Sequence, residues 1–210
     1  HTWMREAFIF VTAFSFFIVS VGVLAQEQGN RPIISYKTDP DALIISYSET
    51  PQMLGHPDKT PRIRVYGNGR VLVHYPDYMQ KAGEYEVYLN PGELNQLLLA
   101  MSGVFEMDTE RAKAARKSLK EQRELQAGAA YYRSEDTLEE MEFLIDSYQP
   151  EPGSNPRPIN RKVEWQNISD DATQFPEFEE IQKLKGARNS VRALLHRDDL
   201  AQVFSMQSTS

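Results

Sequence analysis

Residues 62–75 decide the fold class, and they read Arg-Ile-Arg-Val-Tyr-Gly-Asn-Gly-Arg-Val-Leu-Val-His-Tyr. Polar and apolar side chains alternate on both sides of the Gly67–Gly69 triplet. This pattern is typical of two antiparallel strands joined by a tight turn. The segment therefore predicts a β-hairpin, and the rest of the chain can be interpreted from it.

The register of this hairpin follows from packing. A two-residue turn would mix charged and apolar side chains on one face. A three-residue turn pairs Val65 with Val71 and Ile63 with Val73, and it leaves one face wholly apolar. We therefore expect the three-residue turn, with Gly69 supplying a positive φ. The apolar face then holds Ile63, Val65, Val71, Val73 and Tyr75. The outer face holds Arg62, Arg64, Tyr66, Arg70, Leu72 and His74.

The segment after the hairpin continues the sheet and then changes to a helix. Residues 84–89 alternate again and predict a third strand of a meander. Asn90 has the side chain of an N-cap, Pro91 suits the first helical position, and Glu93 suits the third. The apolar stripe of this helix is Leu94, Leu97, Leu98 and Met101, and Gly103 is expected to end it.

The remaining elements are predicted from the same periodicities. Strands are expected at residues 33–36, 44–47, 138–148 and 159–166, and helices at 109–127 and 176–197. Asp170 and Asp171 are interpreted as caps for that last helix. Antiparallel strands followed by helices indicate an α+β fold. We expect an antiparallel β-meander and a second hairpin, with helices covering one face, in a single domain.

The stretch Pro61–Val104 resembles a segment of exported bacterial proteins of unknown function. In those proteins a Gly-(Asn/Asp)-Gly hairpin precedes a strand and a short Leu-rich helix. The resemblance implies a bacterial exported α+β domain, and it implies no activity and no site residues.

The N-terminal segment has the pattern of a signal peptide. Met4 is the expected initiator, Arg5 precedes an uncharged run from Ala7 to Leu24, and a small-x-small site ends at Ala25. We therefore expect residues 1–25 to be removed by cleavage after Ala25. The alternative is an uncleaved N-terminal helix that anchors the protein, because the run just reaches spanning length. The expected domain is 26–205, followed by a flexible tail at 206–210.

Composition supports export and limits the partners. The 210 residues include no cysteine, and the net charge is −7. A bacterial periplasmic or secreted protein with an adequate core needs no disulfide. An acidic body argues against nucleic acid as a partner. Contact with a membrane is expected only if the N-terminal segment is retained.

The outer hairpin face is the first candidate site. Arg62, Arg64, Arg70 and His74 would form a cationic surface on rigid strands, able to bind a carboxylate or phosphate. The alternative, which we favour, is that the next strand turns acidic residues to the same side and forms cross-strand ion pairs. Tyr78, in the following loop, is the best aromatic candidate for contact with a glycan or peptide.

The helix at 109–127 is the second candidate. Its sequence is rich in lysine and arginine, and Arg116 and Lys120 are the residues selected for a partner surface. Residues 134–151 are strongly acidic, so pairing of the two blocks within the fold is the favoured alternative.

Catalytic and cofactor signatures do not emerge from the sequence. We find no nucleophile elbow, no phosphate-binding glycine loop and no pair of histidines spaced as metal ligands. No cofactor is expected. The sequence favours a non-enzymatic binding module with a protein, anionic or glycan ligand. The alternatives are a hydrolase-type enzyme with an unrecognised site and a structural subunit of an envelope complex.

Overall fold

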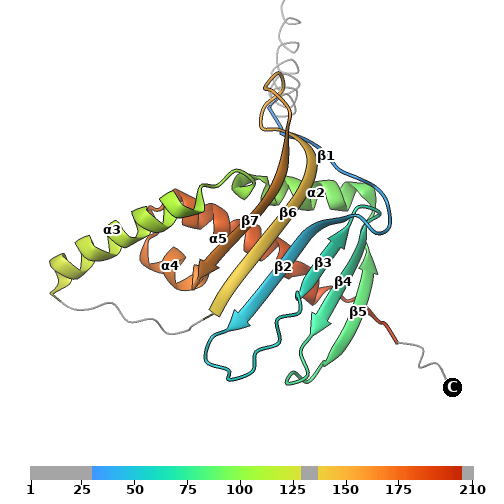
Figure 1. Cartoon of the computed structure of the whole chain (residues 1–210), viewed down its shortest axis with the longest axis horizontal. Helices are drawn as coiled ribbons and strands as arrows, with labels where there is room; N and C mark the ends of the chain where they lie inside the picture. Colours follow the sequence, from blue (N-terminus) through green and yellow to red (C-terminus); the bar gives the residue numbers. More distant parts are fainter. Residues whose placement is uncertain (1–29, 129–136, 205–210) are drawn as a thin grey trace, which may run out of the picture.

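The structure is a computed structural model that describes residues 30–128 and 137–204 (Figure 1). The expected signal peptide at 1–25 and the expected tail at 206–210 lie outside the described residues. Within the described ranges, every helix is too short or too polar to span a bilayer.

The described residues form a single antiparallel sheet, in which β6-β2-β3-β4-β5-β8 follow one another in that order. One edge of β6 pairs with β2 and, further along, with β1, and its other edge pairs with β7. Five of these strands, β2, β4, β5, β6 and β7, have six or more residues. The bounds are β1 Ile33–Ser35, β2 Leu43–Pro51, β3 Ile63–Tyr66, β4 Arg70–Tyr75, β5 Gly83–Tyr88, β6 Thr137–Gln149, β7 Arg157–Gln166 and β8 Ala201–Gln202.

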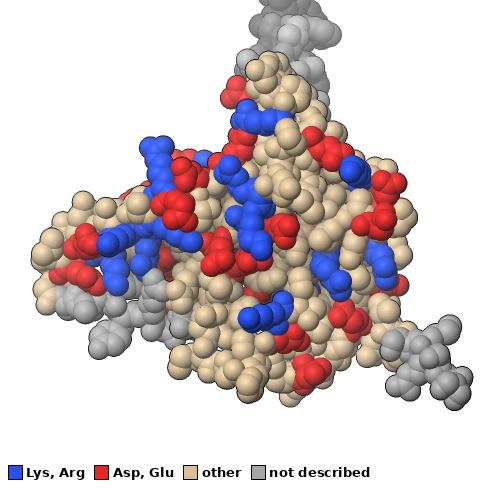
Figure 2. Space-filling view, in the orientation of Figure 1, with Lys and Arg blue, Asp and Glu red and all other residues tan. Residues whose placement is uncertain are grey.

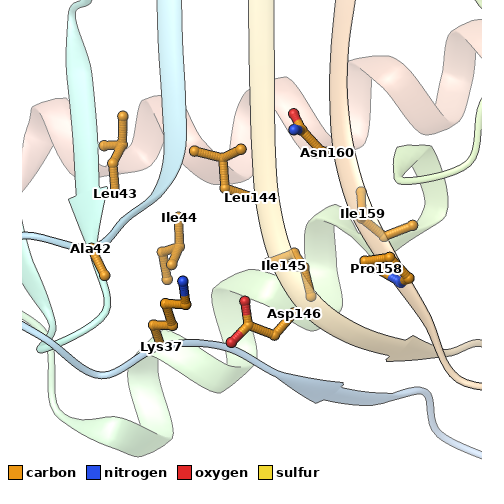
Figure 3. Close-up of a pocket in the computed structure, with 10 residues that line it drawn as sticks. All are labelled: Lys37, Ala42, Leu43, Ile44, Leu144, Ile145, Asp146, Pro158, Ile159 and Asn160. Atoms are coloured by element: carbon orange, nitrogen blue, oxygen red, sulfur yellow. The ribbon is translucent and has the colours of Figure 1, made fainter.

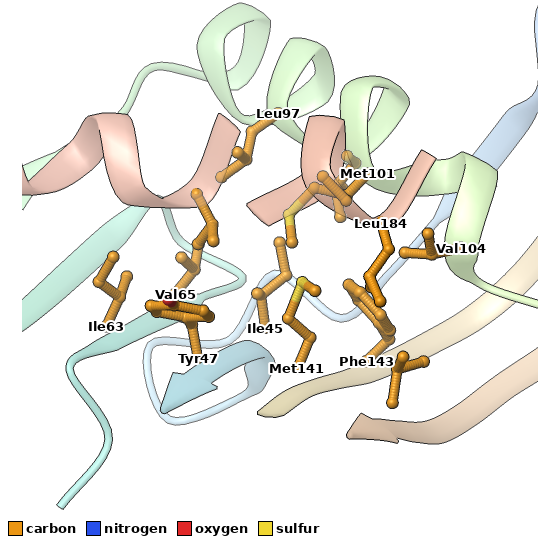
Figure 4. Close-up of a cluster of buried hydrophobic side chains, with 14 of the residues drawn as sticks. Ile45, Tyr47, Ile63, Val65, Leu97, Met101, Val104, Met141, Phe143 and Leu184 are labelled. Carbon is orange, nitrogen blue, oxygen red and sulfur yellow. The ribbon is translucent and has the colours of Figure 1, made fainter. Parts of the chain in front are cut away.

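The helices lie on one side of this sheet and leave the other side open (Figure 1). Their bounds are α2 Pro91–Met101, α3 Thr109–Ala127, α4 Ile168–Gln174 and α5 Glu179–Arg192, with short 3-10 turns at Ser102–Val104 and Ala193–His196. Inward side chains of β2, β3 and β6 pack against α2 and α5, as Figure 4 shows for Ile45, Phe143 and Leu184. The predicted single-domain α+β fold with helices on one face is confirmed.

The predicted register of the first hairpin is also confirmed. Val65 pairs with Val71 and Ile63 with Val73, and all four side chains are fully buried. Gly69 has a φ of +92°, as the three-residue turn requires. A one-residue slip would have placed charged side chains against the helices, so burial of one face fixes the register.

Strands β1 and β2 share the same edge of β6. Ser35 pairs with Ser147, whereas Ile45 pairs with Phe143. The chain between them leaves the sheet and crosses the turn of the first hairpin, where the Gly67 amide donates to the Ala42 carbonyl at 2.8 Å. Three residues of β6, 144–146, therefore have no register partner on this edge among the described strands.

The start of α2 is the predicted one. The Asn90 side chain accepts from the Glu93 amide, and the Glu93 carboxylate accepts from the Asn90 amide. This reciprocal pair satisfies two amides that the helix cannot bond internally. The prediction that Gly103 ends the helix is wrong, because the chain tightens into the 3-10 turn that contains Gly103.

The C-terminal helical region differs from the prediction of one helix over 176–197. Residues Ile168–Gln174 form a separate helix, α4, and α5 begins only at Glu179. Asp170 and Asp171 lie in the first turn of α4 and do not cap α5. Asn167 permits the sharp entry into α4, since it adopts left-handed backbone angles that asparagine tolerates.

Candidate functional site

The outer face of the hairpin carries ion pairs in place of an open cationic surface. Arg64 lies 3.7 Å from Glu84, and Arg70 lies 3.0 Å from Glu86. Figure 2 shows this side of the molecule, where basic and acidic side chains are interspersed. For Arg64 and Arg70, the structure therefore agrees with the alternative that we favoured from the sequence, in which acidic residues of the next strand form cross-strand ion pairs.

His74 is held between two carboxylates on the same face. Its Nε2 lies 2.6 Å from Asp58 and its Nδ1 lies 2.6 Å from Glu84. Burial of the ring lowers its pKa, but the hydrogen bonds to Asp58 and Glu84 outweigh that effect, so the pKa of His74 is raised. The imidazolium thus attaches the loop that carries Asp58 to strand β4.

Arg62 does not lie on the outer face, and this part of the prediction is wrong. Only 6% of its surface is exposed. Its guanidinium lies over the Tyr75 ring and donates to Glu49 at 2.6 Å, at the end of the helix-covered face. The residue precedes the first residue of β3, so the strand alternation does not fix its direction.

The other predicted partner residues are distributed over separate parts of the fold. Arg116 donates three hydrogen bonds from α3 to the buried carboxylate of Asp171, two from Nε and one from Nη2. Lys120 lies 3.7 Å from Glu124 on the same helix, and Tyr78 is exposed in the loop after β4. Among the described residues, Arg116 of α3 forms an ion pair with Asp171, and Arg123 of α3 forms one with Glu177. The expected pairing with residues 134–151 does not appear among the ion pairs of the described chain.

A buried polar cluster that the sequence did not predict lies at one end of the helix-covered face. Glu49 of β2 and Glu139 of β6 are direct cross-strand partners, and like charges in that relation repel. The Tyr47 hydroxyl lies between them, at 2.8 Å from Glu49 and 2.7 Å from Glu139. Burial and the Glu139 charge raise the pKa of Tyr47 far above its ordinary value, so the hydroxyl remains a donor.

Arginines from two other elements compensate this pair of carboxylates. Arg188 and Arg192 lie four residues apart, on the same side of α5. Arg192 pairs with Glu49, and Arg188 Nε lies 3.6 Å from Glu139. With Arg62, the cluster holds three guanidinium groups against two carboxylates. We name Tyr47, Glu49, Arg62, Glu139, Arg188 and Arg192 the inner polar cluster.

A small pocket of about 130 Å³ adjoins the inner polar cluster. Its walls come from the start of β6, the start of α4 and the two arginines of α5, Arg188 and Arg192. The lining residues are Thr137, Glu139, Asn167, Ile168, Ser169, Asp170, Arg188 and Arg192. We name it the inner pocket.

A larger pocket of about 520 Å³ lies on the open side of the sheet, where the chain between β1 and β2 leaves β6. Figure 3 shows it with the helices behind the strands. Much of the lining is aliphatic, and Lys37 and Asp146 add one charge of each sign. The lining residues are Lys37, Ala42, Leu43, Ile44, Leu144, Ile145, Asp146, Pro158, Ile159 and Asn160. We name it the open-face pocket.

Within residues 30–128 and 137–204, no group of three or more histidine or acidic side chains is arranged to hold a metal ion. The described residues form a single-domain α+β protein with an open sheet face, and the inner pocket and the open-face pocket differ in chemistry. No protein-family model matches the chain, and neither a curated protein nor a solved structure is similar to it.

Proposed function

We propose that this protein is a non-enzymatic binding module of the bacterial envelope, and that it binds a protein partner on the open face of its sheet. The leader pattern at residues 1–25 and the absence of cysteine support export. The resemblance of Pro61–Val104 to exported bacterial proteins supports the same location.

The observation that carries the proposal is the open-face pocket. It lies on the side of the sheet that no described helix covers, and its volume is within the range of ligand sites. Leu43 and Leu144 offer apolar surface there, and Lys37 and Asp146 lie close to each other at the same pocket (Figure 3). An aliphatic or aromatic side chain fits this lining better than a sugar or a phosphate does.

The surroundings favour a protein partner over a polyanion. On the same face of the sheet, Arg64 of β3 and Arg70 of β4 already neutralise carboxylates, and both signs of charge are present there. The unpartnered edge of β6 at 144–146 offers backbone groups to an extended segment. Arg116 is engaged by Asp171, so we assign the partner surface to the sheet and not to α3.

Selection of a phage-displayed peptide library on the immobilised full chain tests this function. We expect enriched peptides to share one large apolar side chain. Leu144→Arg should weaken them at least about tenfold, since it fills and charges the pocket. Leu125→Arg, at a position of α3 that is 85% exposed, is the matched control and should bind normally. No enrichment, or equal binding to Leu144→Arg, would reject the open-face site.

Export is tested separately by intact mass. Expression of the full coding sequence in a Gram-negative host should give a periplasmic protein that begins at Gln26. Retention of Met4–Ala25 in a membrane fraction would support the anchored alternative, and residence in the cytosol would reject export.

A further inference from the structure

The inner pocket combines two buried nitrogen donors that have no hydrogen-bond partner in the described chain. One is Nδ2 of Asn167, and the other is Nε of Arg188. Asn167 is 4% exposed, and both residues line the pocket. Buried donors are almost always paired in folded proteins, so two unpaired donors in one pocket indicate a missing acceptor.

The orientation of the Asn167 amide is fixed by its other hydrogen bond. Its Oδ1 accepts from the Thr137 amide at 3.0 Å, and the Asn167 amide donates to the Thr137 carbonyl at 2.9 Å. Exchange of the oxygen and nitrogen of the side chain would place two donors against each other. The NH₂ group is therefore directed away from Thr137, as a free donor.

Arg188 is held in the pocket wall by contacts that use its other groups. One of its terminal nitrogens donates to Ser169, and the side chain is 13% exposed. Glu139 is 3.6 Å from Nε, beyond hydrogen-bond reach, and its carboxylate accepts from Tyr47 at 2.7 Å. The Nε proton of Arg188 thus remains available to a ligand.

The charged side chains that line the inner pocket are balanced. Arg188 and Arg192 contribute two positive charges, and Glu139 and Asp170 contribute two negative charges. A group with two negative charges therefore gains no net attraction from the lining. Two unpaired donors in one pocket match the two oxygens of a carboxylate, which carries a single negative charge.

We propose that the inner pocket binds a carboxylate, with one ligand oxygen accepting from Asn167 Nδ2 and the other from Arg188 Nε. A volume of about 130 Å³ admits a carboxylate with a short substituent, and any larger part of the ligand would lie outside the pocket. The carboxylate belongs either to a small free acid or to the C-terminus of a peptide. This site is separate from the open-face pocket, because it lies on the helix-covered side of the sheet.

Titration of the ¹⁵N-labelled full chain with sodium acetate tests the proposal, at constant ionic strength set with sodium chloride. The Asn167 NH₂ and Arg188 Nε–H resonances should shift in a saturable way, with a Kd of about millimolar order. Sodium phosphate should not compete. N-acetylglycine and N-acetylglycinamide distinguish the two sources: tighter binding of N-acetylglycine than of acetate indicates a peptide terminus, whereas tighter acetate binding indicates a free acid. The amide should not bind in either case.

Two variants and one control complete the test. Asn167→Asp keeps the acceptor for Thr137 and replaces the free donor by an anionic oxygen, so acetate should bind at least about tenfold more weakly. Arg188→Lys keeps the charge and removes Nε, with the same expected loss. Arg64→Lys is the matched control, because Arg64 also has a buried Nε without a hydrogen-bond partner in the described chain but lies on the other face. Absent or unsaturable shifts in the wild type, or undiminished binding to both variants, would overturn the proposal.

Discussion

Arg116 and Asp171 form an ion pair that joins α3 to α4, with Nε and Nη2 of the arginine 3.2 and 3.1 Å from the carboxylate. Asp171 is 1% exposed, and it also accepts from Trp165 Nε1 at 2.8 Å. Helix α3 buries only Ala112 among its residues. Together with the contacts of Arg123 with Gln174 and Glu177, this ion pair attaches a helix that projects beyond the sheet (Figure 1).

Arg116→Ala should destabilise the fold by about 3 kcal/mol, because it leaves the Asp171 carboxylate buried without its cation. Lys113→Ala is the control on the same helix, since its pair with Glu110 is solvent-exposed and worth less than about 1 kcal/mol. Urea unfolding followed by circular dichroism measures both. Equal effects of the two substitutions would show that the Arg116 pair contributes no more than a surface pair.

Tyr47→Phe should cost more than Tyr75→Phe. The first removes the hydroxyl that the buried Glu139 and the partly buried Glu49 share, and we expect a loss of about 2 to 3 kcal/mol. The second removes a donor to the Leu195 carbonyl, with an expected loss of about 1 kcal/mol. The free energies of unfolding in urea decide the order, and the reverse order would contradict the role given to Tyr47.

Gly67→Ala should destabilise the protein by about 2 kcal/mol or more through steric overlap. A Cβ at Gly67 would lie 1.7 Å from the Lys37 carbonyl oxygen, so the chain between β1 and β2 would have to move. Gly55→Ala meets nothing within 4 Å and should leave the melting temperature unchanged or slightly raised. If Gly67→Ala left the melting temperature unchanged, the segment between β1 and β2 would not be held against Gly67.

The Asp58–His74–Glu84 arrangement should make stability depend on pH in two directions. The folded pKa of His74 lies above its ordinary 6.5, so its contribution is complete below that value and is lost as the pH rises through the folded pKa. The hydrogen bond from His74 lowers the pKa of Asp58 from 3.8 to about 2. That contribution is complete above pH 3.8 and is lost as the pH falls toward 2.

His74→Gln is the variant that isolates this effect. It should reduce the free energy of unfolding most between about pH 4 and 6.5, and progressively less as the pH rises through the folded pKa of His74. His196→Gln, at the end of the last 3-10 turn, is the control. Urea unfolding across the pH range, with NMR titration of the His74 ring, gives the measurement. A His74 pKa at or below 6.5 in the folded protein would refute the attachment by an imidazolium.

Local signals in the sequence were sufficient for most of the fold. The alternation around Gly69 fixed the hairpin register, and the Asn90–Glu93 capping box fixed the start of α2. Helix α3 has the bounds expected from Gly128, which takes a left-handed conformation at its end. Each of these depends on neighbouring residues alone, so it is visible before tertiary structure is known.

The inner polar cluster was not predicted, because its members come from four separated segments. Alternation around Met141 and Phe143 already directs Glu139 inward, and this buried glutamate was the available signal. Its partners on β2 and α5 become neighbours only in the folded sheet. Arg62 was misplaced for a related reason, since a residue just before a strand turns toward whichever partner tertiary structure supplies, here Glu49.

Hydrogen–deuterium exchange on the full chain, with and without a peptide selected on it, tests the central claim most directly. The account predicts that bound peptide slows exchange at residues 37–44, 144–146 and 158–160, around the open-face pocket, and leaves α2 and α5 unchanged. Protection confined to α3, or to the helices on the covered side, would contradict binding at the open face.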